Sequence, residues 1–413
     1  MQPSPATLSE ARLLAGYIIF SASYLVFALG KFPGMKIDRP GMAVIGAVLM
    51  FAFRILGPSD GLRFIDFATV VLLFSMMVIV ANLRLVGFFD AVATWVVVRL
   101  GPRHLLPAVI LSSGLLSAFF VNDIICLVMV PIVLSLARRL GVRPLGYLLA
   151  VATASNIGSV ATITGNPQNI LIGSYSDIPY RSFLWHLGPV ALVGLLLDWA
   201  ILHWLFPHDE ARTGAEPDPA HPAIPRTSFT KAVLVVLFVM AGFLAGLPPP
   251  LVAAVGAALM LITRTLEPRL MYDEVDWGLL VFFVGLFLIV GGAEKVGITE
   301  QLLRLARELN LHNAATFTAI TAVLSNIVSN VPAVMLLKSV VPGFAQPHRA
   351  WMLLAMASTL AGNLTITGSI ANIIVVEGAR PAVNITFRDY LRAGVPVTLA
   401  TITFGAVWLW LVG

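Results

Sequence analysis

Long apolar runs, separated by Gly, Pro and charged residues, fill most of the chain. Each run has roughly 17–28 residues, which is enough for a helix to cross about 30 Å of hydrocarbon. The pattern therefore predicts about ten transmembrane helices. They are expected near residues 13–30, 40–57, 65–83, 146–173, 184–206, 231–247, 249–265, 275–295, 350–377 and 389–411.

Two further apolar regions, 103–138 and 313–343, are interrupted at their centres by polar residues. Each region is too long for one membrane crossing and too short for two. We interpret them as re-entrant hairpins, which enter and leave the membrane on the same side. The segments 84–99 and 296–310, which precede the hairpins, are interpreted as amphipathic helices on the membrane surface.

A polar stretch, Thr153–Ile172 (TASNIGSVATITGNPQNILI), lies within the predicted helix 146–173. A near-copy, Leu360–Val375 (LAGNLTITGSIANIIV), lies within the predicted helix 350–377. The tetrapeptide TITG occurs in both, and an Asn-Ile pair follows it at the same spacing. So many polar residues in a membrane-spanning helix indicate that the helix is broken to hold a polar group. Both helices are therefore predicted to be broken at a binding site.

Matching residues recur along the chain at a nearly constant interval. The pairs include Pro40 and Pro250, Gly46 and Gly256, Asp66 and Asp276, Gly87 and Gly297, Asn122 and Asn330, and Gly165 and Gly368. The chain is therefore predicted to hold two homologous repeats, 1–206 and 231–413, joined by a polar, Pro-rich linker at 207–230. Because each repeat has an odd number of crossings, the repeats are expected in opposite orientations across the membrane.

The Lys and Arg residues indicate which side of the membrane each loop occupies. If the crossings alternate from the N-terminus, 17 of the 26 Lys and Arg residues fall on one side and 9 on the other. Cytoplasmic loops are rich in Lys and Arg, so the richer side is expected to be cytoplasmic. The linker 207–230 is then cytoplasmic and both termini lie outside. We expect the chain to reside in the cell (inner, cytoplasmic) membrane.

The composition agrees with a membrane protein, because 58% of the 413 residues are hydrophobic and only 11% are charged, against roughly 25% charged in soluble domains. The predicted fold class is an all-α integral membrane protein with about ten transmembrane helices and two re-entrant hairpins. The net charge of +5 follows from the basic loops and does not indicate nucleic acid as a partner. The expected partners are the lipid bilayer and a small anionic or polar solute.

Two smaller features exclude other classes of structure. The one cysteine, Cys126, leaves no internal disulfide and no cysteine-cluster metal site. The first apolar run has no basic region before it and no cleavage motif after it. It is therefore expected to be a retained helix rather than a signal peptide.

Four polar interruptions have the pattern of helix starts: two at the hairpin centres and two in the broken helices. The expected capping residues are Asn122 or Asp123, Asn166, Asn330 and Ser369. Helix starts at bilayer depth leave N–H groups that suit an anion or a polar neutral solute. The carbonyls released at a break suit Na⁺. The alternative is that these polar residues only cap kinks and mediate helix packing.

Two carboxylates fall inside apolar segments. Asp123, at the centre of the first hairpin, is costly there and is therefore a candidate proton carrier. It could also offset the charge of a bound cation, or only cap the restarting helix. Asp198, within LLLDWAILHW, either pairs with a neighbour or lies near the membrane interface.

Two halves, each with a hairpin and a helix broken at an ATITG-N-P-x-N type motif, resemble the ion transporter superfamily. This group includes divalent anion/Na⁺ symporters, citrate transporters, Na⁺/H⁺ antiporters and arsenite/antimonite permeases. The motif NDIICLVMVP, the sequence ITGS at Ile366–Ser369 and the tail ITFRDYLRAGVP are similar to the arsenite permeases. SNIGSVATITGNPQN is closer to the broader anion-transporter pattern. The resemblance covers nearly the whole chain.

The resemblance implies a site for substrate and ions between the two hairpin tips. Its residues would be Asn122, Asp123, Ser159, Thr162, Thr164, Gly165, Asn166, Ser329, Asn330, Asn363, Thr365, Thr367, Gly368 and Ser369. Na⁺ would be held at Asn122, Gly165, Asn330 and Gly368. The dicarboxylate members carry Ser-Asn-Thr at both tips, whereas this chain has Val-Asn-Asp and Ser-Asn-Val. This difference weakens the case for Na⁺ and favours H⁺ as the coupling ion. Relatives of this superfamily are often homodimers, so a homodimer is also possible by resemblance.

The resulting hypothesis is a secondary active transporter of an anion or oxyanion-forming solute, coupled to H⁺ or Na⁺ as its only cofactor. Arsenite or antimonite competes with a carboxylate or another inorganic anion as the substrate. A Na⁺/H⁺ antiporter of the same fold is an alternative. A channel would need a continuous polar lining, and an intramembrane enzyme would need a catalytic motif such as H-E-x-x-H or G-x-S-x-G, which the sequence lacks. The sequence also lacks a P-loop, so ATP could be used only through a partner subunit.

Overall fold

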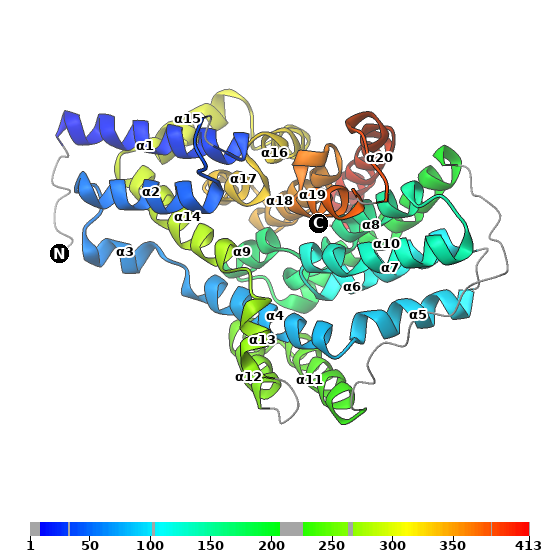
Figure 1. Ribbon diagram of the computed structural model, residues 1–413. Helices are drawn as coiled ribbons and strands as arrows, with labels where there is room; N and C mark the ends of the chain where they lie inside the picture. The colour runs from blue at the N-terminus through cyan, green and yellow to red at the C-terminus, as the bar shows by residue number, and fades with distance from the viewer. Residues whose placement is uncertain are drawn as a thin grey trace.

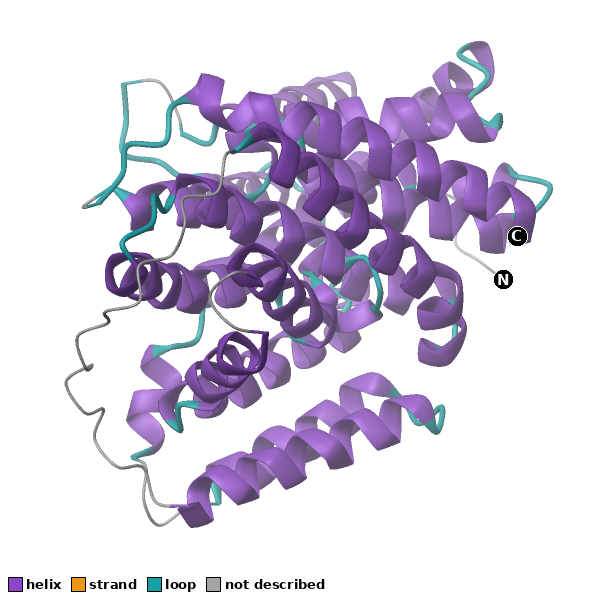
Figure 2. Ribbon diagram, turned by 90° about the vertical axis from the view of Figure 1, so that its right-hand side faces the viewer, coloured by secondary structure: helices purple, strands orange, loops and turns teal. Residues whose placement is uncertain are grey.

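The computed structural model describes residues 9–31, 34–100, 104–206, 226–262, 267–380 and 382–412. These residues form helices and loops and contain no β-strand beyond an isolated bridge between Lys31 and Asp38 (Figures 1 and 2). Six helices in the described part are long and apolar enough to cross a membrane. They are α1 (Glu10–Leu29), α4 (Phe67–Leu85), α10 (Tyr180–Leu205), α11 (Arg226–Leu244), α14 (Trp277–Lys295) and α20 (Phe387–Val412).

Shorter helices lie between these six. In the first half they are α2 (Arg39–Ala52), α3 (Pro58–Phe64), α5 (Phe88–Leu100), α6 (Leu105–Phe119), α7 (Asn122–Leu140), α8 (Leu145–Ser159) and α9 (Pro167–Ser176). In the second half they are α12 (Pro249–Leu261), α13 (Pro268–Asp273), α15 (Ile298–Glu308), α16 (Ala314–Val328), α17 (Asn330–Leu337), α18 (Pro347–Leu360) and α19 (Ile370–Ala379). Four 3₁₀ turns complete the described elements: η2 (Ile163–Gly165), η3 (Val341–Gly343), η4 (Ala361–Asn363) and η5 (Ile366–Gly368).

The helices α2 and α12 are shorter than the sequence predicts. They have 14 and 13 residues, or about 20 Å at the rise of an α-helix, against about 30 Å of hydrocarbon. The structure therefore places α2 and α12 on only part of the predicted ranges 40–57 and 249–265, of which 263–265 lie outside the described residues. After α2 the chain turns at Arg54, which has a positive φ of 55°, and then begins α3.

The two segments predicted as hairpins are each formed by a pair of helices with a short break. Phe120 and Val121 separate α6 from α7, and Ser329, with a φ of 77°, separates α16 from α17. The two other polar stretches interrupt longer helical segments. The turn η2 lies between α8 and α9, and η4 and η5 lie between α18 and α19.

The helix starts at these breaks match the predicted capping residues in two of four cases. Asn166 caps α9 and its side chain accepts a hydrogen bond from the N–H of Asn169; Ser369 occupies the N-cap of α19. The predictions for the hairpins are wrong by one residue or more, because α7 is capped by Val121 and α17 by Ser329. Asn122 and Asn330 are thus the first residues of their helices, and their side chains are free to serve other partners.

The predicted surface helices differ from each other. The helix α15 carries its charged and apolar residues on separate faces, as expected of an amphipathic helix. The helix α5 (FFDAVATWVVVRL) is apolar on most of its circumference, so its interpretation as amphipathic is wrong. Phe88 and Phe89 at its start pack against Phe120, beside the break between α6 and α7.

Two glycines make a close contact between the helices α6 and α8. A Cβ atom added to Gly158 of α8 would lie 1.9 Å from the carbonyl oxygen of Gly114 on α6. No side chain fits at that distance, so the glycine sets how closely α8 approaches the hairpin. This contact lies one residue before the end of α8 and positions the break that follows it.

We expect Gly158→Ala to destabilise the protein by about 1–3 kcal/mol or more, because the added methyl group pushes two buried backbones apart. The matched control is Gly188→Ala in α10, where the nearest atom to the new Cβ would be 3.4 Å away on the flexible Leu184 side chain. The measurement is thermal unfolding of the purified proteins in one detergent. A melting temperature for Gly158→Ala equal to that of the control would contradict this role of the α6–α8 contact.

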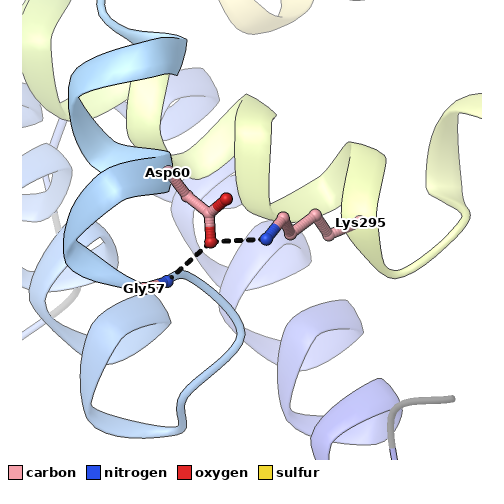
Figure 3. A network of polar contacts seen from close by, with 3 residues as sticks. All are labelled: Gly57, Asp60 and Lys295. Atoms are coloured by element: carbon pink, nitrogen blue, oxygen red, sulfur yellow. Dashed lines mark hydrogen bonds and ion pairs between the residues drawn. The ribbon is translucent and has the colours of Figure 1, made fainter. Parts of the chain in front are cut away.

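An ion pair joins the short helix α3 to the end of α14 (Figure 3). One carboxylate oxygen of Asp60 lies 2.5 Å from the Lys295 ammonium and also accepts a hydrogen bond of 2.9 Å from the N–H of Gly57. The Lys295 hydrogen bond, followed by that of Gly57, lowers the pKa of Asp60. The pair is partly exposed, so its contribution to stability is at most about 1 kcal/mol.

The lowered pKa of Asp60 fixes the pH range in which the ion pair acts. The contribution is fully present above about pH 3.9, the ordinary pKa of an aspartate, and is lost as pH falls through the lower pKa of the folded state. We therefore expect the stability difference between wild type and Asp60→Asn to stay constant from about pH 8 to about pH 5 and to shrink only below about pH 4. Thermal unfolding across this range measures it, and a difference that fades near neutrality would show that another group is responsible.

Candidate functional site

A cavity of about 140 Å³ lies where the four helices that follow the breaks begin, α7, α9, α17 and α19, here called the half-helices. We call the residues that line it the cavity wall. They are Arg39, Pro40, Asn122, Asp123, Pro167, Gln168, Asp276, Gly278, Leu279, Phe282, Ser329, Asn330, Val331, Ser369 and Ile370. Both halves of the chain contribute to the wall, and the four half-helices are labelled in Figure 1.

The first residues of the four half-helices supply much of the cavity wall. These are Asn122 of α7, Pro167 of α9, Asn330 of α17 and Ile370 of α19. The first turn of a helix has N–H groups without partners in the helix and carries about half a positive charge. Four such starts at one cavity provide hydrogen-bond donors and a positive potential, although the wall contains only one basic side chain, Arg39.

Three charged side chains also belong to the cavity wall. Asp123 is half-buried on the first turn of α7, and Asp276 is the N-cap of α14, where it accepts a hydrogen bond of 2.9 Å from the N–H of Leu279. Arg39, the first residue of α2, donates from Nε to the carbonyl oxygen of Phe27 at 2.9 Å. The side chains of the wall therefore carry one more negative than positive charge when both carboxyl groups are ionised.

Behind the cavity, Asn156 of α8 joins both halves. Its Nδ2 donates to Oδ1 of Asn363 at 2.8 Å and to Oδ1 of Asn372 at 2.9 Å. Its Oδ1 accepts from Nδ2 of Asn122 at 2.8 Å and from Oγ of Ser369 at 3.1 Å. We call these five residues the Asn156 cluster. One buried amide thus connects the first hairpin to the break in the second half.

A second cluster joins the halves the other way round, with a helix of the second half bound to the break in the first half. Thr359 of α18 accepts hydrogen bonds from Nδ2 of Asn166 at 3.1 Å and from Nε2 of Gln168 at 3.2 Å, and its Oγ1 lies 3.4 Å from Oδ1 of Asn169. We call these four residues the Thr359 cluster. The spacing that pairs Gly165 with Gly368 also pairs Asn156 with Thr359. Asn156 of α8 thus binds residues at the break in the second half, and Thr359 of α18 binds residues at the break in the first half.

The carbonyls released at both breaks are bound by asparagine side chains. Nδ2 of Asn169 donates to the carbonyl oxygens of Ser159 at 3.1 Å and Thr162 at 3.0 Å. Nδ2 of Asn372 donates in the same way, to Gly362 at 2.6 Å and Thr365 at 2.9 Å. These carbonyls, which the sequence offered as Na⁺ ligands, already have donors.

Two side-chain oxygens at the hairpin tips are buried and have no hydrogen-bond partner among the described residues. They are Oδ1 of Asn122 and Oδ1 of Asn330. A buried amide oxygen without a partner is unfavourable by about 1–3 kcal/mol, so such atoms are suited to a ligand. Since both residues line the cavity, the two tips offer one acceptor each to a solute or a cation.

The structure divides the predicted site residues into two groups. Five belong to the cavity wall, and nine lie behind it or at its sides. The first group is Asn122, Asp123, Ser329, Asn330 and Ser369; the second is Ser159, Thr162, Thr164, Gly165, Asn166, Asn363, Thr365, Thr367 and Gly368. Thr162 and Thr164 donate to the carbonyls of Ala118 and Phe119 and so hold the end of α6.

The second group braces the breaks rather than facing the cavity. Gly165 lies against the backbone of Ser159, because an added Cβ would be 2.2 Å from the Ser159 carbonyl oxygen. Thr365 donates to Oδ1 of Asn326 at 3.1 Å, and Thr367, which is exposed, lies 3.4 Å from Thr365. The Na⁺ sites predicted at Gly165 and Gly368 stay predictions.

The sequence did not identify several residues that the structure places at the site. They are Arg39, Gln168 and Asp276 in the cavity wall and Asn156, Thr359 and Asn372 in the clusters behind it. Asp276 and Asn372 were visible as repeat partners of Asp66 and Asn169, and Asn156 stands within the polar stretch. The position of Arg39 gave no signal, because a basic residue at the start of a helix is common in a membrane protein.

A cavity formed by broken helices from two halves, among apolar helices of spanning length, is typical of a membrane transporter. The chain matches the family model described as citrate transporter over residues 24–361. The chain belongs to this citrate transporter family, within the ion transporter superfamily, as its motifs indicate. It is therefore a multi-pass membrane protein whose relatives are transporters of small solutes.

Three relatives match nearly the whole chain. An uncharacterized transporter of Mycobacterium tuberculosis is 32% identical over 424 residues, covering 95% of this chain and 97% of the relative. The silicon efflux transporter LSI3 of Oryza sativa subsp. japonica is 30% identical over 479 residues, covering 97% and 98%. The putative transporter arsB of Dictyostelium discoideum is 24% identical over 500 residues, covering 92% and 88%.

Among solved structures, the chain is similar to the YdaH transporter of Alcanivorax borkumensis. The TM-score is 0.62, the sequence identity is 14%, and the match covers 97% of both chains. At this identity the similarity shows the fold and not the solute.

We expect Asn156→Ala to be strongly destabilising, because it leaves four groups of the Asn156 cluster without their partner. Each buried polar group left unpaired is unfavourable by about 1–3 kcal/mol. The matched control is Ser112→Ala, since the hydroxyl of Ser112 bonds only carbonyls of its own helix, Ala108 and Val109. Thermal unfolding in a common detergent measures both, and equal melting temperatures would contradict the bridging role of Asn156.

Proposed function

We propose that this protein is a secondary active transporter that exchanges a small hydroxylated oxyacid, of the arsenous or silicic acid class, for protons. The observation that carries the proposal is the cavity wall, which combines four helix starts with two carboxylates and one guanidinium. Such a wall offers many hydrogen-bond donors and acceptors and little net charge.

The charges of the cavity wall favour a neutral solute over a multiply charged anion. A tricarboxylate bound there would lie near Asp123 and Asp276, and Arg39 offsets one of the two. Each close pair of like charges is unfavourable by about 1–4 kcal/mol at the dielectric of water or of a protein surface. A neutral oxyacid avoids this repulsion, because its hydroxyls can donate to the free oxygens of Asn122 and Asn330.

The names of two relatives support the same class of solute. One is named as a silicon efflux transporter and another as arsB. Both silicic and arsenous acid are small and carry several hydroxyl groups on one central atom. Undissociated acids of this kind fit a cavity whose polar groups are amides, hydroxyls and helix N–H groups.

Asp123 is the proposed proton carrier. An unpaired charge at the centre of an apolar hairpin is costly, so the empty cavity favours its protonated form. A hydroxyl of the bound solute would donate to the carboxylate form. Proton and solute therefore compete for the same carboxyl group, and this competition produces exchange rather than co-transport.

The proposed architecture has ten membrane spans, two re-entrant hairpins and two inverted repeats, 1–206 and 231–413. Matching elements of equal length support it: α4 and α14 have 19 residues, α6 and α16 have 15, α9 and α19 have 10, and α10 and α20 have 26. Alternating access would then arise from movement of one bundle against the other around the fixed cavity. Both termini are proposed to lie outside the cell membrane, with a cytoplasmic linker 207–230, of which 207–225 lie outside the described residues.

Co-transport with Na⁺ is the second candidate, and the free oxygens of Asn122 and Asn330 favour it. Amide oxygens are suitable Na⁺ ligands, and the two lie at the two hairpin tips. Against it, the break carbonyls already accept hydrogen bonds from Asn169 and Asn372. The Na⁺/H⁺ antiporter and a homodimer stay predictions from the resemblance.

Transport by proteoliposomes holding the purified protein tests the proposal. We expect an imposed pH gradient to drive uptake of arsenite or silicate by the wild type. Asp123→Asn should reduce gradient-driven uptake at least tenfold, because it cannot carry a proton, and should retain exchange of labelled for unlabelled solute, because the amide oxygen still accepts a hydrogen bond. Glu10→Gln, an exposed carboxyl in the first turn of α1, is the control and should behave like wild type.

Other results would favour other functions. Flux that follows a Na⁺ gradient and ignores pH would support the second candidate. Citrate transport would show that the charge argument is wrong. Exchange of Na⁺ for H⁺ without a solute would identify an antiporter, and flux that neither gradient drives uphill would indicate a channel.

A further inference from the structure

Asp198 is a buried carboxyl group outside the cavity wall, and the transport proposed above does not use it. It lies in the C-terminal half of α10, one of the helices of spanning length, and its exposed fraction is 0%. The sequence offered two readings, a paired residue or one near the interface. In the described part of the chain Asp198 forms no ion pair, and it faces into the helix bundle rather than toward lipid.

The hydrogen bonds of Asp198 fit a protonated carboxyl group. Its Oδ2 lies 3.1 Å from Oγ1 of Thr153 on α8, while its Oδ1 has no partner among the described residues. The same Thr153 hydroxyl lies 2.9 Å from the carbonyl oxygen of Leu149. A hydroxyl group has one hydrogen, so it cannot donate to both oxygens.

Only one protonation state satisfies both of these contacts. When Asp198 is protonated, it donates to Oγ1 of Thr153, and Thr153 donates to Leu149. When Asp198 is ionised, Thr153 must turn its hydrogen to the carboxylate, and the Leu149 carbonyl loses a donor. Because a buried carboxylate without a cation is also costly in itself, the arrangement shown here favours the proton-bound form.

Two further polar groups lie on α20, which packs against α10. The hydroxyls of Tyr390 and Thr398 are buried and have no hydrogen-bond partner among the described residues. Tyr390 lies within electrostatic reach of Asp198 and of Cys126 on α7. Among the described residues, no cation forms an ion pair with Asp198.

A chain of contacts connects Asp198 to the cavity. The peptide oxygen of Thr153 accepts a hydrogen bond of 3.2 Å from Nδ2 of Asn363, and Asn363 accepts one of 2.8 Å from Asn156. Asn156 in turn binds Asn122 of the cavity wall. Thr153 therefore contacts Asp198 through its hydroxyl and the Asn156 cluster through its peptide oxygen.

We propose that Asp198 is a second proton-binding site of this transporter, separate from Asp123 and coupled to the cavity through Thr153 and the Asn156 cluster. On release, the proton of Asp198 passes to a water molecule that enters when α10 and α8 move apart and leaves as hydronium, and the carboxylate then accepts a hydrogen bond from the hydroxyl of Thr153. On uptake the proton returns from water and Thr153 turns back to Leu149. This inference rests on the proposed function, because it assigns the second proton to the transport cycle.

Several titratable side chains on α10 and on helices packed against it have contacts other than Asp198. His186 of α10 contacts His348, Lys231 of α11 binds the carbonyl oxygen of Ile262, and His203 packs against Trp199. Tyr390 of α20 and Cys126 of α7 are the neighbours named above.

Infrared difference spectroscopy of the protein in lipid nanodiscs tests the proposal, because a protonated carboxylic acid has its own carbonyl band. We compare spectra across pH for wild type, Asp198→Asn and Asp123→Asn. The asparagine matches aspartate in volume and can still accept from Thr153. We expect a buried carboxyl band that titrates in the wild type and in Asp123→Asn and is lost in Asp198→Asn. No solute is needed, so the result does not depend on which substrate is transported.

A second variant keeps the test decisive if Asp198→Asn does not fold. Thr153→Val retains shape and removes the hydroxyl, and we expect it to move the titration midpoint of the Asp198 band by about one pH unit or more. A band that stays fully protonated at every pH in wild type and in Thr153→Val would overturn the proposal and leave Asp198 as a neutral packing group. Failure of all solute flux with a titrating Asp198 band would refute the proposed function alone.

Transport measurements then place the second proton in the cycle. We expect Asp198→Asn to flatten the dependence of solute flux on pH while exchange of labelled solute continues. Unchanged pH dependence in a folded Asp198→Asn protein would overturn the coupling between this site and the cavity.

Discussion

A helix broken inside a membrane releases backbone groups that lipid cannot pair, and the protein must pair them itself. The side chains of Asn169 and Asn372 do this for the carbonyls at the two breaks. Asn156 and Thr359 then connect each break to the opposite half. Because these side chains pair the carbonyls at the breaks, the N–H groups at the helix starts are the backbone polar groups left to face the cavity. These helix starts therefore form the polar part of the site.

The same constraint determines how charge is distributed at the site. Donors come from the first turns of four helices, which are fixed in place and need no counter-ion, while the acceptors are amide oxygens and two carboxylates. Under the proposed function, a site made in this way would suit hydrogen-bonding solutes without a strong net electric field. Its selectivity would then depend on the protonation of single carboxyl groups, because one proton is a large change where the charges are so nearly balanced.

The sequence was sufficient for the features that depend on local chemistry. Apolar runs located the long helices, and Asn166 before Pro167 located the start of α9. It failed where packing decides: an apolar run does not reveal that α2 ends at Ala52, nor that Val121 and Ser329 cap the hairpin helices. Arg39 and Asp276 reach the cavity only because α2 and α14 pack against each other, which no short pattern records. The repeats, the span count and the ligands of the site stay predictions.

The two linking residues are not equivalent, and this difference has a consequence for the energy of the transport cycle. Asn156 makes four hydrogen bonds, three of them to the other half, whereas its counterpart Thr359 has one hydroxyl to share. If the halves exchange roles as access alternates, the two end states cannot be mirror images in energy. The protein would then rest mainly on one side of the membrane even without a gradient, and solute would meet a higher affinity from one compartment than from the other.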